Sequence, residues 1–249
     1  MSRLIRAEFR KLSTVRTFKG LIAGAVVFSL VRFTMIVVSA GKIEAAPLGT
    51  AASTKDMLLA AGSGTIVFLV IGVLSVSTEV RHGTIDWTFL ATPDRWRVLA
   101  SKVAAVVLLS AVYLVAMGAV LVGLTAAVFS REGIPFGAVV NKEMLAVLGG
   151  VMIGMPLYGA LGVGLGALIP NQIASLMIPL AWILVVETLL PSFGLMGLMA
   201  WMPGGATASL GRADLPGLLP MWAGAVLMAG YAAAAVAAGG AAITKRDFT

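Results

Sequence analysis

The feature of this sequence that most constrains its fold is a series of long runs without a charged side chain. Roughly 20 apolar residues, rising ~1.5 Å each, are enough to cross the ~30 Å hydrocarbon core of a bilayer. Only 12% of the 249 residues are charged, against about 25% in a typical soluble domain. The runs therefore predict membrane-spanning helices. They are Met57–Thr78, Val103–Ser130, Met144–Val186, Thr188–Gly211 and Leu215–Thr244.

The predicted fold is all-α: one polytopic domain, residues 1–249, with six transmembrane helices. The run 144–186 is about twice the length of one crossing, so we divide it at Ile169–Gln172, where a proline interrupts it. The first span contains a single charge, Arg32. Its end, Val38-Ser39-Ala40, resembles a signal-peptide cleavage site, but the span is long and follows nineteen residues of cytoplasmic character. The predicted spans are 20–40, 57–78, 103–129, 144–168, 173–190 and 218–243.

The distribution of Lys and Arg predicts the orientation. Twelve of them fall on the side that carries both termini and the second loop, against five on the other side. Short cytoplasmic loops carry the excess of positive charge, so we expect a multi-pass protein of the plasma membrane with both termini cytoplasmic. This topology explains the net charge of +7, and we do not expect a nucleic-acid partner.

Three segments outside the spans have features of their own. Residues 3–16 place Leu4, Ile5, Phe9 and other apolar side chains on one helical face, which predicts a helix in the membrane interface that anchors or guides the first span. The loop Glu79–Ser101 is longer than a simple connection requires. On the outer side, 195–202 is apolar but too short to cross, and prolines flank it. We expect a re-entrant or interfacial segment there, between spans five and six.

Small residues recur in span four. Gly150 and Gly154, then Gly162 and Gly166, have the four-residue spacing that lets helices approach closely. We interpret them as packing positions within the chain rather than as a dimer motif.

The sequence argues against an enzyme. His82, the single histidine, lies in a loop, there is no cysteine, and no aspartate lies in a predicted span. A phosphate-binding Gly-Lys-Ser/Thr loop is absent too. We expect no catalytic residue, metal or cofactor in this chain, and any use of ATP requires a partner.

Two ionisable residues fall inside predicted spans, Arg32 and Glu187. They lie roughly 18 Å and 21 Å from the inner ends of their helices at ~1.5 Å per residue, so their depths match. A charge at this depth costs a few kcal/mol and faces protein or water. We expect them to form an intramembrane polar pair, which either fixes two helices or lines a substrate route; the alternative is that each reaches separately toward water.

Four blocks of sequence, in order, resemble the membrane subunits of type-2 ATP-binding-cassette exporters, particularly those of actinobacteria. Pro170 departs from the pattern, which has a basic or polar residue before Asn171-Gln172. The blocks are RAEFRKL (6–12) with VRT (15–17); EVRHGTI (79–85) with TFLATP (88–93) and Lys102; GLGALIPNQ (164–172) through VVE (185–187); and KRDFT (245–249).

The resemblance implies six spans, an N-terminal interfacial helix, and a dimer of two membrane subunits, either identical or related. It also implies that the loop after span two rests on a separate ATP-binding-cassette ATPase subunit. The residues that would make this contact are Glu79, Arg81, His82, Gly83, Thr84 and Ile85.

Two functions of different class remain open from the sequence. The first is the permease subunit of an ATP-driven exporter that moves a small hydrophobic or amphipathic compound out of the cell. The second is a membrane carrier, assembly factor or sensor that works without an ATPase. Secondary carriers commonly show inverted repeats, and we find none here.

Overall fold

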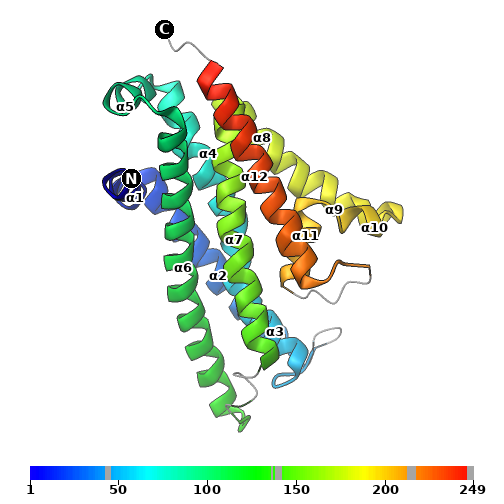
Figure 1. The fold of residues 1–249 in the computed structure, drawn as a ribbon. Coiled ribbons are helices and arrows are strands. Elements are labelled where there is room, and N and C mark those ends of the chain that lie inside the picture. The colour runs from blue at the N-terminus through cyan, green and yellow to red at the C-terminus, as the bar shows by residue number, and fades with distance from the viewer. Residues whose placement is uncertain (43–45, 136, 138–141, 212–216, 246–249) are drawn as a thin grey trace.

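The computed structural model describes residues 1–42, 46–135, 137, 142–211 and 217–245, and within these ranges the protein is helical, without strands (Figure 1). Six helical segments are long and apolar enough to cross a membrane, which confirms the predicted all-α, six-span architecture. They are Arg16–Ser39, Ala51–Arg81, Arg95–Arg131, Met144–Leu168, Gln172–Phe193 and Met221–Lys245.

Successive spans alternate in direction. The first span, α2 (Arg16–Ser39), begins at the same end of the bundle where α12 (Met221–Lys245) finishes. The N-terminal helix α1 (Ser2–Thr14) and the short helix α5 (Ile85–Ala91) lie toward this end as well (Figure 1). We call it the α5 end. It carries most of the Lys and Arg residues, and its cytoplasmic location stays a prediction.

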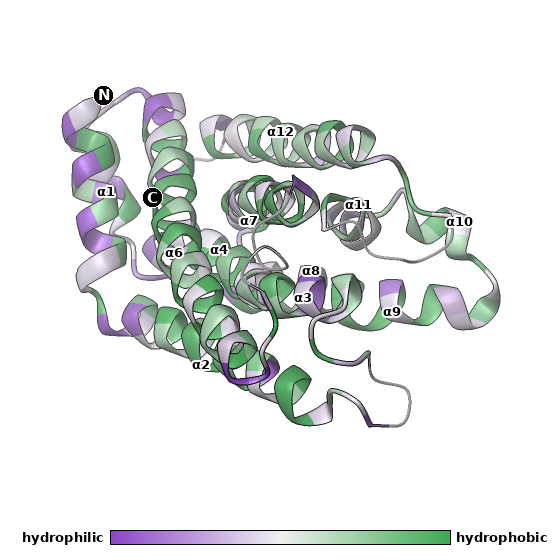
Figure 2. Ribbon diagram, turned by 90° about the horizontal axis from the view of Figure 1, so that it is seen from below, coloured by the Kyte–Doolittle hydropathy of each residue, from purple (hydrophilic) through white to green (hydrophobic). Residues whose placement is uncertain are grey.

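The helix α7 (Lys142–Leu168) lies at the centre of the bundle, surrounded by α4 (Thr65–Arg81), α6 (Arg95–Arg131) and α12 (Figure 2). Glycines allow this close packing: a Cβ on Gly162 would overlap the Leu69 carbonyl oxygen of α4. The four glycines singled out in span four all face neighbouring segments of the same chain.

The first and fifth spans lie at the periphery. Only 17% of the apolar window is buried in α2 and in Gln172–Phe193, against 61% in the second span. The outer face of α2 carries Phe28, Val31 and Met35, all exposed in the single chain. In Figure 2 most of the ribbon of the spans is green, hydrophobic, whereas the ribbon of α1 has purple, hydrophilic stretches. Such a surface suits lipid or a second membrane chain.

Two spans differ in shape from the sequence prediction. The second consists of α3 (Ala51–Leu59), a 3₁₀ turn η1 (Ala60–Gly64) and α4, rather than one straight helix. The third is longer than predicted: at ~1.5 Å per residue, the 37 residues of α6 measure about 55 Å. Asp94 accepts a hydrogen bond from the Arg97 backbone N–H at 3.1 Å, so the helix starts well before the apolar run.

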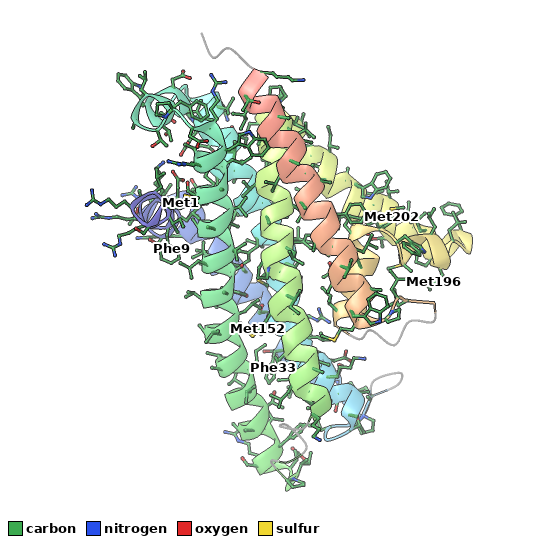
Figure 3. All side chains as sticks on the ribbon, in the orientation of Figure 1. Met1, Phe9, Phe33, Met152, Met196 and Met202 are labelled. Atoms are coloured by element: carbon green, nitrogen blue, oxygen red, sulfur yellow. The ribbon has the colours of Figure 1, made fainter. Side chains whose placement is uncertain are left out.

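The fifth span is irregular. It consists of α8 (Gln172–Ala181), a π-helical segment η3 (Trp182–Val186), a short α9 (Glu187–Leu189) and the 3₁₀ turn η4 (Leu190–Phe193). Two short helices follow, α10 (Met196–Met199) and α11 (Pro203–Leu210). The labelled Met196 and Met202 lie beside the bundle rather than at either end of it (Figure 3). Arg212 and the block 246–249 lie outside the described residues.

Candidate functional site

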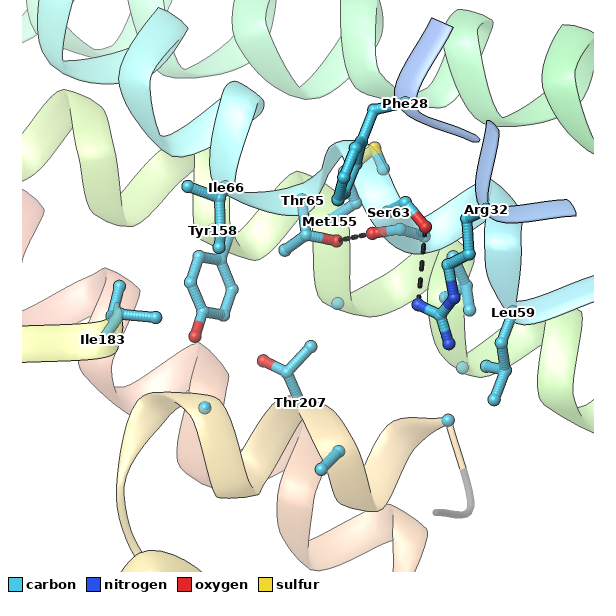
Figure 4. A pocket seen from close by; sticks show the side chains of 17 residues that line it. Phe28, Arg32, Leu59, Ser63, Thr65, Ile66, Met155, Tyr158, Ile183 and Thr207 are labelled. Carbon is cyan, nitrogen blue, oxygen red and sulfur yellow. Dashed lines mark hydrogen bonds between the residues drawn. The ribbon is translucent and has the colours of Figure 1, made fainter. Parts of the chain in front are cut away.

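A cavity of about 430 Å³ opens between α2, η1, α7, η3 and α11 (Figure 4). The break in the second span contributes directly to it, because Gly62 and Ser63 of η1 form part of its wall. Gly150 and Gly154 of α7 form another part, and a Cβ on either would meet Leu210 of α11. The break in the second span and the close approach of α11 to α7 therefore shape a cavity inside the spanning region.

Arg32 is the charged side chain among the 17 residues that line this cavity. Its guanidinium group donates to the Ser63 hydroxyl, with an Nη1–Oγ distance of 3.4 Å (Figure 4). Within the part of the chain that the structure describes, no carboxylate lies within 4.0 Å of it. The Arg32 side chain is exposed in the single chain. A guanidinium group has five N–H donors, so the described residues use only a small part of its hydrogen-bonding capacity.

Glu187 is buried, with 3% of its surface exposed. Its Oε2 accepts a hydrogen bond from the Gly204 backbone N–H at 2.6 Å, while Oε1 is buried without a hydrogen-bond partner. Gly204 lies in the first turn of α11, where unpaired N–H groups attract negative charge. Glu187 thus caps α11.

The predicted ion pair between Arg32 and Glu187 is therefore not formed in this structure. Each side chain has a different partner: a hydroxyl of η1 for Arg32 and the start of α11 for Glu187. The second contact was not predictable from the sequence, because Glu187 and the start of α11 are 16 residues apart and meet only after the chain folds. The two residues remain near one cavity, since Gly204 lines it beside Arg32.

Tyr158 and Thr207 are functional candidates that the sequence analysis missed. Both line the cavity, from α7 and α11, and their hydroxyl groups point into the space between these helices (Figure 4). Tyr158 is only 2% exposed. It is the sole tyrosine in the uncharged run 144–186, and a buried phenol normally requires a polar neighbour. That isolated hydroxyl is the signal that could have identified it.

A second cavity, of about 350 Å³, lies beside the first and is almost entirely apolar. Leu161, Leu165, Ile178 and Trp182 contribute to its wall. Ile183 lines both cavities. The π-helical segment that contains Trp182 and Ile183 therefore lies where a mostly apolar cavity with a few polar groups meets one that is almost entirely apolar.

Four charged residues form a closed network at the α5 end, which we call the charge cluster. Lys102 of α6 contacts Glu8 Oε2 at 2.9 Å and Glu79 Oε1 at 2.8 Å. Lys11 contacts Glu8 Oε1 at 2.7 Å and Glu79 Oε1 at 3.0 Å. Lys102 also donates to the Ser75 carbonyl oxygen at 3.0 Å. The cluster joins α1, α4 and α6 where their ends meet.

Burial raises the pKa of the Glu8 carboxyl, but the ammonium groups of Lys102 and Lys11 outweigh this effect and hold the pKa below its usual value. Burial alone would lower the pKa of the Lys11 amine. The carboxylates of Glu8 and Glu79 have the larger opposite effect, so the pKa of Lys11 is raised above its usual value. Both shifts favour the charged forms. The sequence analysis missed this cluster, although Glu8 is the single acidic residue among the first 19.

The six residues predicted to contact an ATPase occupy different environments. Glu79 is half-buried in the charge cluster, and Ile85 is 1% exposed. Arg81 donates to the Gln172 side chain at 3.0 Å, which joins the end of α4 to the start of α8. The four exposed members are Arg81, His82, Gly83 and Thr84.

The helix α5 is fixed on one side and open on the other. Ile85 packs into the core, and the Arg95 guanidinium group lies 5.1 Å from the centre of the Phe89 ring. The opposite face presents Trp87 and Leu90, which are 74% and 75% exposed. Large apolar side chains this exposed, at the end of the bundle, form a surface suited to another protein.

No model of a known protein family matches this chain, and a search among curated proteins finds no match either.

Proposed function

We propose that this chain is the membrane-spanning subunit of an ATP-driven exporter, which moves a small hydrophobic or amphipathic compound out of the cell with ATP hydrolysed by a separate subunit. The observation that carries the proposal is α5. It lies outside the spanning bundle, is fixed to α4 and α6 by Ile85 and Phe89, and exposes Trp87 and Leu90 on its outer face. We place the ATPase on that face and on the exposed turn 81–84 beside it.

The charge cluster supports this assignment because it would transmit force. Glu79 stands two residues before the exposed turn 81–84 that leads to α5, and Lys102 holds it to α6 while Lys11 holds it to α1. A displacement of α5 by an ATPase would therefore move α1, α4 and α6 together. In this arrangement Glu79 transmits the movement within the membrane subunit, and the exposed residues 81–84 make the contact with the ATPase.

Two peripheral elements complete the proposed arrangement. α1 lies in the cytoplasmic interface, with Glu8 and Leu12 turned to the protein and basic side chains turned outward; blue nitrogen atoms fan away from it in Figure 3. The segment with α10 and α11 is re-entrant from the outer side. At membrane depth, Glu187 accepts a hydrogen bond from a free N–H group in the first turn of α11.

The exposed faces of α2 and α8 provide the surface for a second membrane subunit, identical or related.

The alternative is a membrane carrier or sensor that functions without an ATPase, and the cavity beside Arg32 would serve it equally well. Purification from native membranes in mild detergent separates the two. We expect an ATP-binding-cassette ATPase to be recovered with the chain. Recovery of the chain alone, with transport intact in vesicles that lack ATP, would refute the exporter.

Variants of α5 locate the contact. Trp87→Ala with Leu90→Ala should reduce recovery of the ATPase at least tenfold, with the melting temperature of the membrane subunit unchanged. Trp222→Ala is the matched control, because Trp222 is 71% exposed but lies at the start of α12, at the opposite end of the bundle. Equal recovery with both variants would place the ATPase elsewhere.

A further inference from the structure

We infer that the two neighbouring cavities are the head and tail sites for one class of ligand, a single-chain amphipathic anion with a carboxylate or phosphate head. The head binds at Arg32 and the chain enters the apolar cavity beyond Ile183. As a description of the exported substrate this inference rests on the proposed function, whereas binding itself can be measured without transport.

Arg32 places a positive charge beside the first cavity. A guanidinium group at membrane depth costs several kcal/mol unless an acid, a carbonyl oxygen or water compensates it. Arg32 has one hydroxyl partner at 3.4 Å and, among the described residues, no carboxylate within ion-pairing distance. A cation left without a counter-charge beside a cavity favours an anionic occupant, and a guanidinium group binds carboxylate and phosphate with two parallel hydrogen bonds.

The other polar groups of the first cavity agree with an anion. The hydroxyl groups of Ser63, Tyr158 and Thr207 face it. Those of Ser63 and Tyr158 can donate a hydrogen bond to an anion, whereas Thr207 donates to the Pro203 carbonyl oxygen at 2.9 Å. The nearby acid, Glu187, is bound to the Gly204 N–H and is not among the lining residues. Arg32 is therefore the charged residue that lines the cavity.

The second cavity supplies the site for an apolar chain. Tyr158 and Leu161 are three residues apart on α7 and so occupy one face of that helix, Tyr158 in the first cavity and Leu161 in the second. Ile183, from η3, borders both cavities. Volumes of about 430 and 350 Å³ fall within the range of small-molecule sites. A molecule that fills both needs a polar head at one end and an apolar remainder.

The test is scintillation-proximity binding of tritiated dodecanoate to the purified complex in nanodiscs of phosphatidylcholine. Unlabelled dodecyl phosphate should compete as well as dodecanoate itself, and dodecanol at least tenfold more weakly. Dodecyltrimethylammonium should not compete. If the cation competes best, the acid Glu187 governs the site and the inference is wrong. Displacement of dodecanoate by adding phosphatidylglycerol to the nanodiscs would identify the occupant as a bilayer lipid and would overturn the single-chain assignment.

Variants test the head site at Arg32 and the tail site beyond Ile183 separately. Arg32→Gln should weaken dodecanoate binding at least tenfold and leave dodecanol unchanged, while Arg32→Lys should retain most of the affinity. Ile183→Trp should weaken both compounds. Tyr158→Phe, which keeps the ring, should weaken dodecanoate a few-fold and provides a second test if Arg32→Gln fails to fold. Arg131→Gln, at the far end of α6, is the control.

The outcome of the binding test is independent of the exporter assignment. If no ATPase is recovered from native membranes and dodecanoate binding still depends on Arg32, the anion site stands and the missing ATPase contradicts the proposed export. Recovery of an ATPase with dodecanoate binding that Arg32→Gln does not change would leave the exporter standing and remove the anion site.

Discussion

Lys102 of α6 and Glu8 of α1 form an ion pair in which Nζ and Oε2 lie 2.9 Å apart and both side chains are almost completely buried. An ion pair removed from water this far stabilises a protein only when its remaining hydrogen-bonding positions are filled. Lys11, Glu79 and the Ser75 carbonyl oxygen fill them here. The pair therefore fixes the position of α1 against the third span, and it does so within the wider charge cluster.

Removing one member of this pair should destabilise the protein strongly. Lys102→Met leaves Glu8 with Lys11 as its partner, and Glu8→Leu leaves Lys102 with Glu79, so each variant buries charge that is incompletely compensated. We expect losses of about 3–5 kcal/mol for each single change and a smaller loss for the double change than their sum. Chemical unfolding in detergent measures the free energy of unfolding of the two single variants and of the double variant.

The exposed pair of Arg97 and Asp94 is the control for this experiment. Its distance, 3.0 Å, is similar, but the side chains are 70% and 47% exposed. Arg97→Ala should cost less than about 1 kcal/mol. Comparable losses for Arg97→Ala and Lys102→Met would mean that burial does not set the strength of the cluster.

Stability should depend on pH through the same residues. The pKa of Glu8 is lowered in the folded protein, so its contribution is complete above the unfolded value, near 4.5, and is lost as the pH falls through the folded value. The pKa of Lys11 is raised above 10.5, so its contribution is lost as the pH rises through the folded value. Melting temperatures from pH 3 to 11 should show both limbs, and Glu8→Gln should flatten the acid limb. An acid limb that is unchanged in Glu8→Gln would assign it to other carboxyl groups.

The effects of Arg32→Ala and Glu187→Ala should add. The two residues have different partners, Ser63 and the start of α11, so the double variant should lose the sum of the single losses within about 0.5 kcal/mol. Loss of the α11 cap should account for about 0.5–2 kcal/mol of this. Thermal unfolding in detergent gives the three values. A larger coupling energy would mean that the residues pair in the assembled complex.

Glycine packing gives a further prediction. Gly162→Ala places a Cβ against the Leu69 carbonyl oxygen, so α4 and α7 must separate, at a cost of about 1–3 kcal/mol. Gly123→Ala, in α6, meets open space and should be neutral or stabilising by about 0.5–1 kcal/mol. The free energies of unfolding of both variants compare the cost of forcing α4 and α7 apart with the gain from a better helix former. A neutral Gly162→Ala would show that the two helices can move apart freely.

The sequence predicted the elements determined by hydropathy. Long apolar runs, interrupted only by Arg32 and Glu187, locate all six spans because crossing a bilayer leaves few alternatives. The boundaries were less accurate where helices continue beyond the apolar run, as α6 does from Arg95 to Val103. The break at η1 was also missed, since Gly62, Ser63 and Gly64 are as compatible with an apolar helix as with a 3₁₀ turn.

The candidate site was predictable only in part. Arg32 and Glu187 were identified as the charges inside the spans, because a charge in an apolar run is conspicuous. Their partners depend on which helices become neighbours, and periodicity within one helix contains no such information. The charge cluster was missed for the same reason: Glu8 and Lys102 are 94 positions apart and meet only after α1 folds against α6.

The turn at Gly83 provides the test that links the structure to the proposed mechanism. Gly83 ends α4 with φ of +64°, a conformation that costs other residues roughly 1–2 kcal/mol. Its N–H donates to the Val80 carbonyl oxygen at 3.2 Å, and the Thr84 N–H donates to the Glu79 carbonyl oxygen at 3.0 Å. Proline removes the first of these donors and fixes φ near −65°. Gly83→Pro should therefore misdirect α5 while the six spans still insert.

Gly133 offers a matched control for this variant. It ends α6 with φ of +71°, at the opposite end of the bundle, in a turn that the Ile134 N–H closes by donating to the Phe129 carbonyl oxygen. Gly133→Pro therefore imposes a similar local penalty away from α5. Expression, recovery of the ATPase and compound-stimulated ATP hydrolysis are measured for both variants. We expect Gly83→Pro to reduce recovery or stimulated hydrolysis at least tenfold and Gly133→Pro to leave both close to the parent protein. If Gly83→Pro retains full stimulated hydrolysis and export, α5 is not the element that couples this chain to ATP.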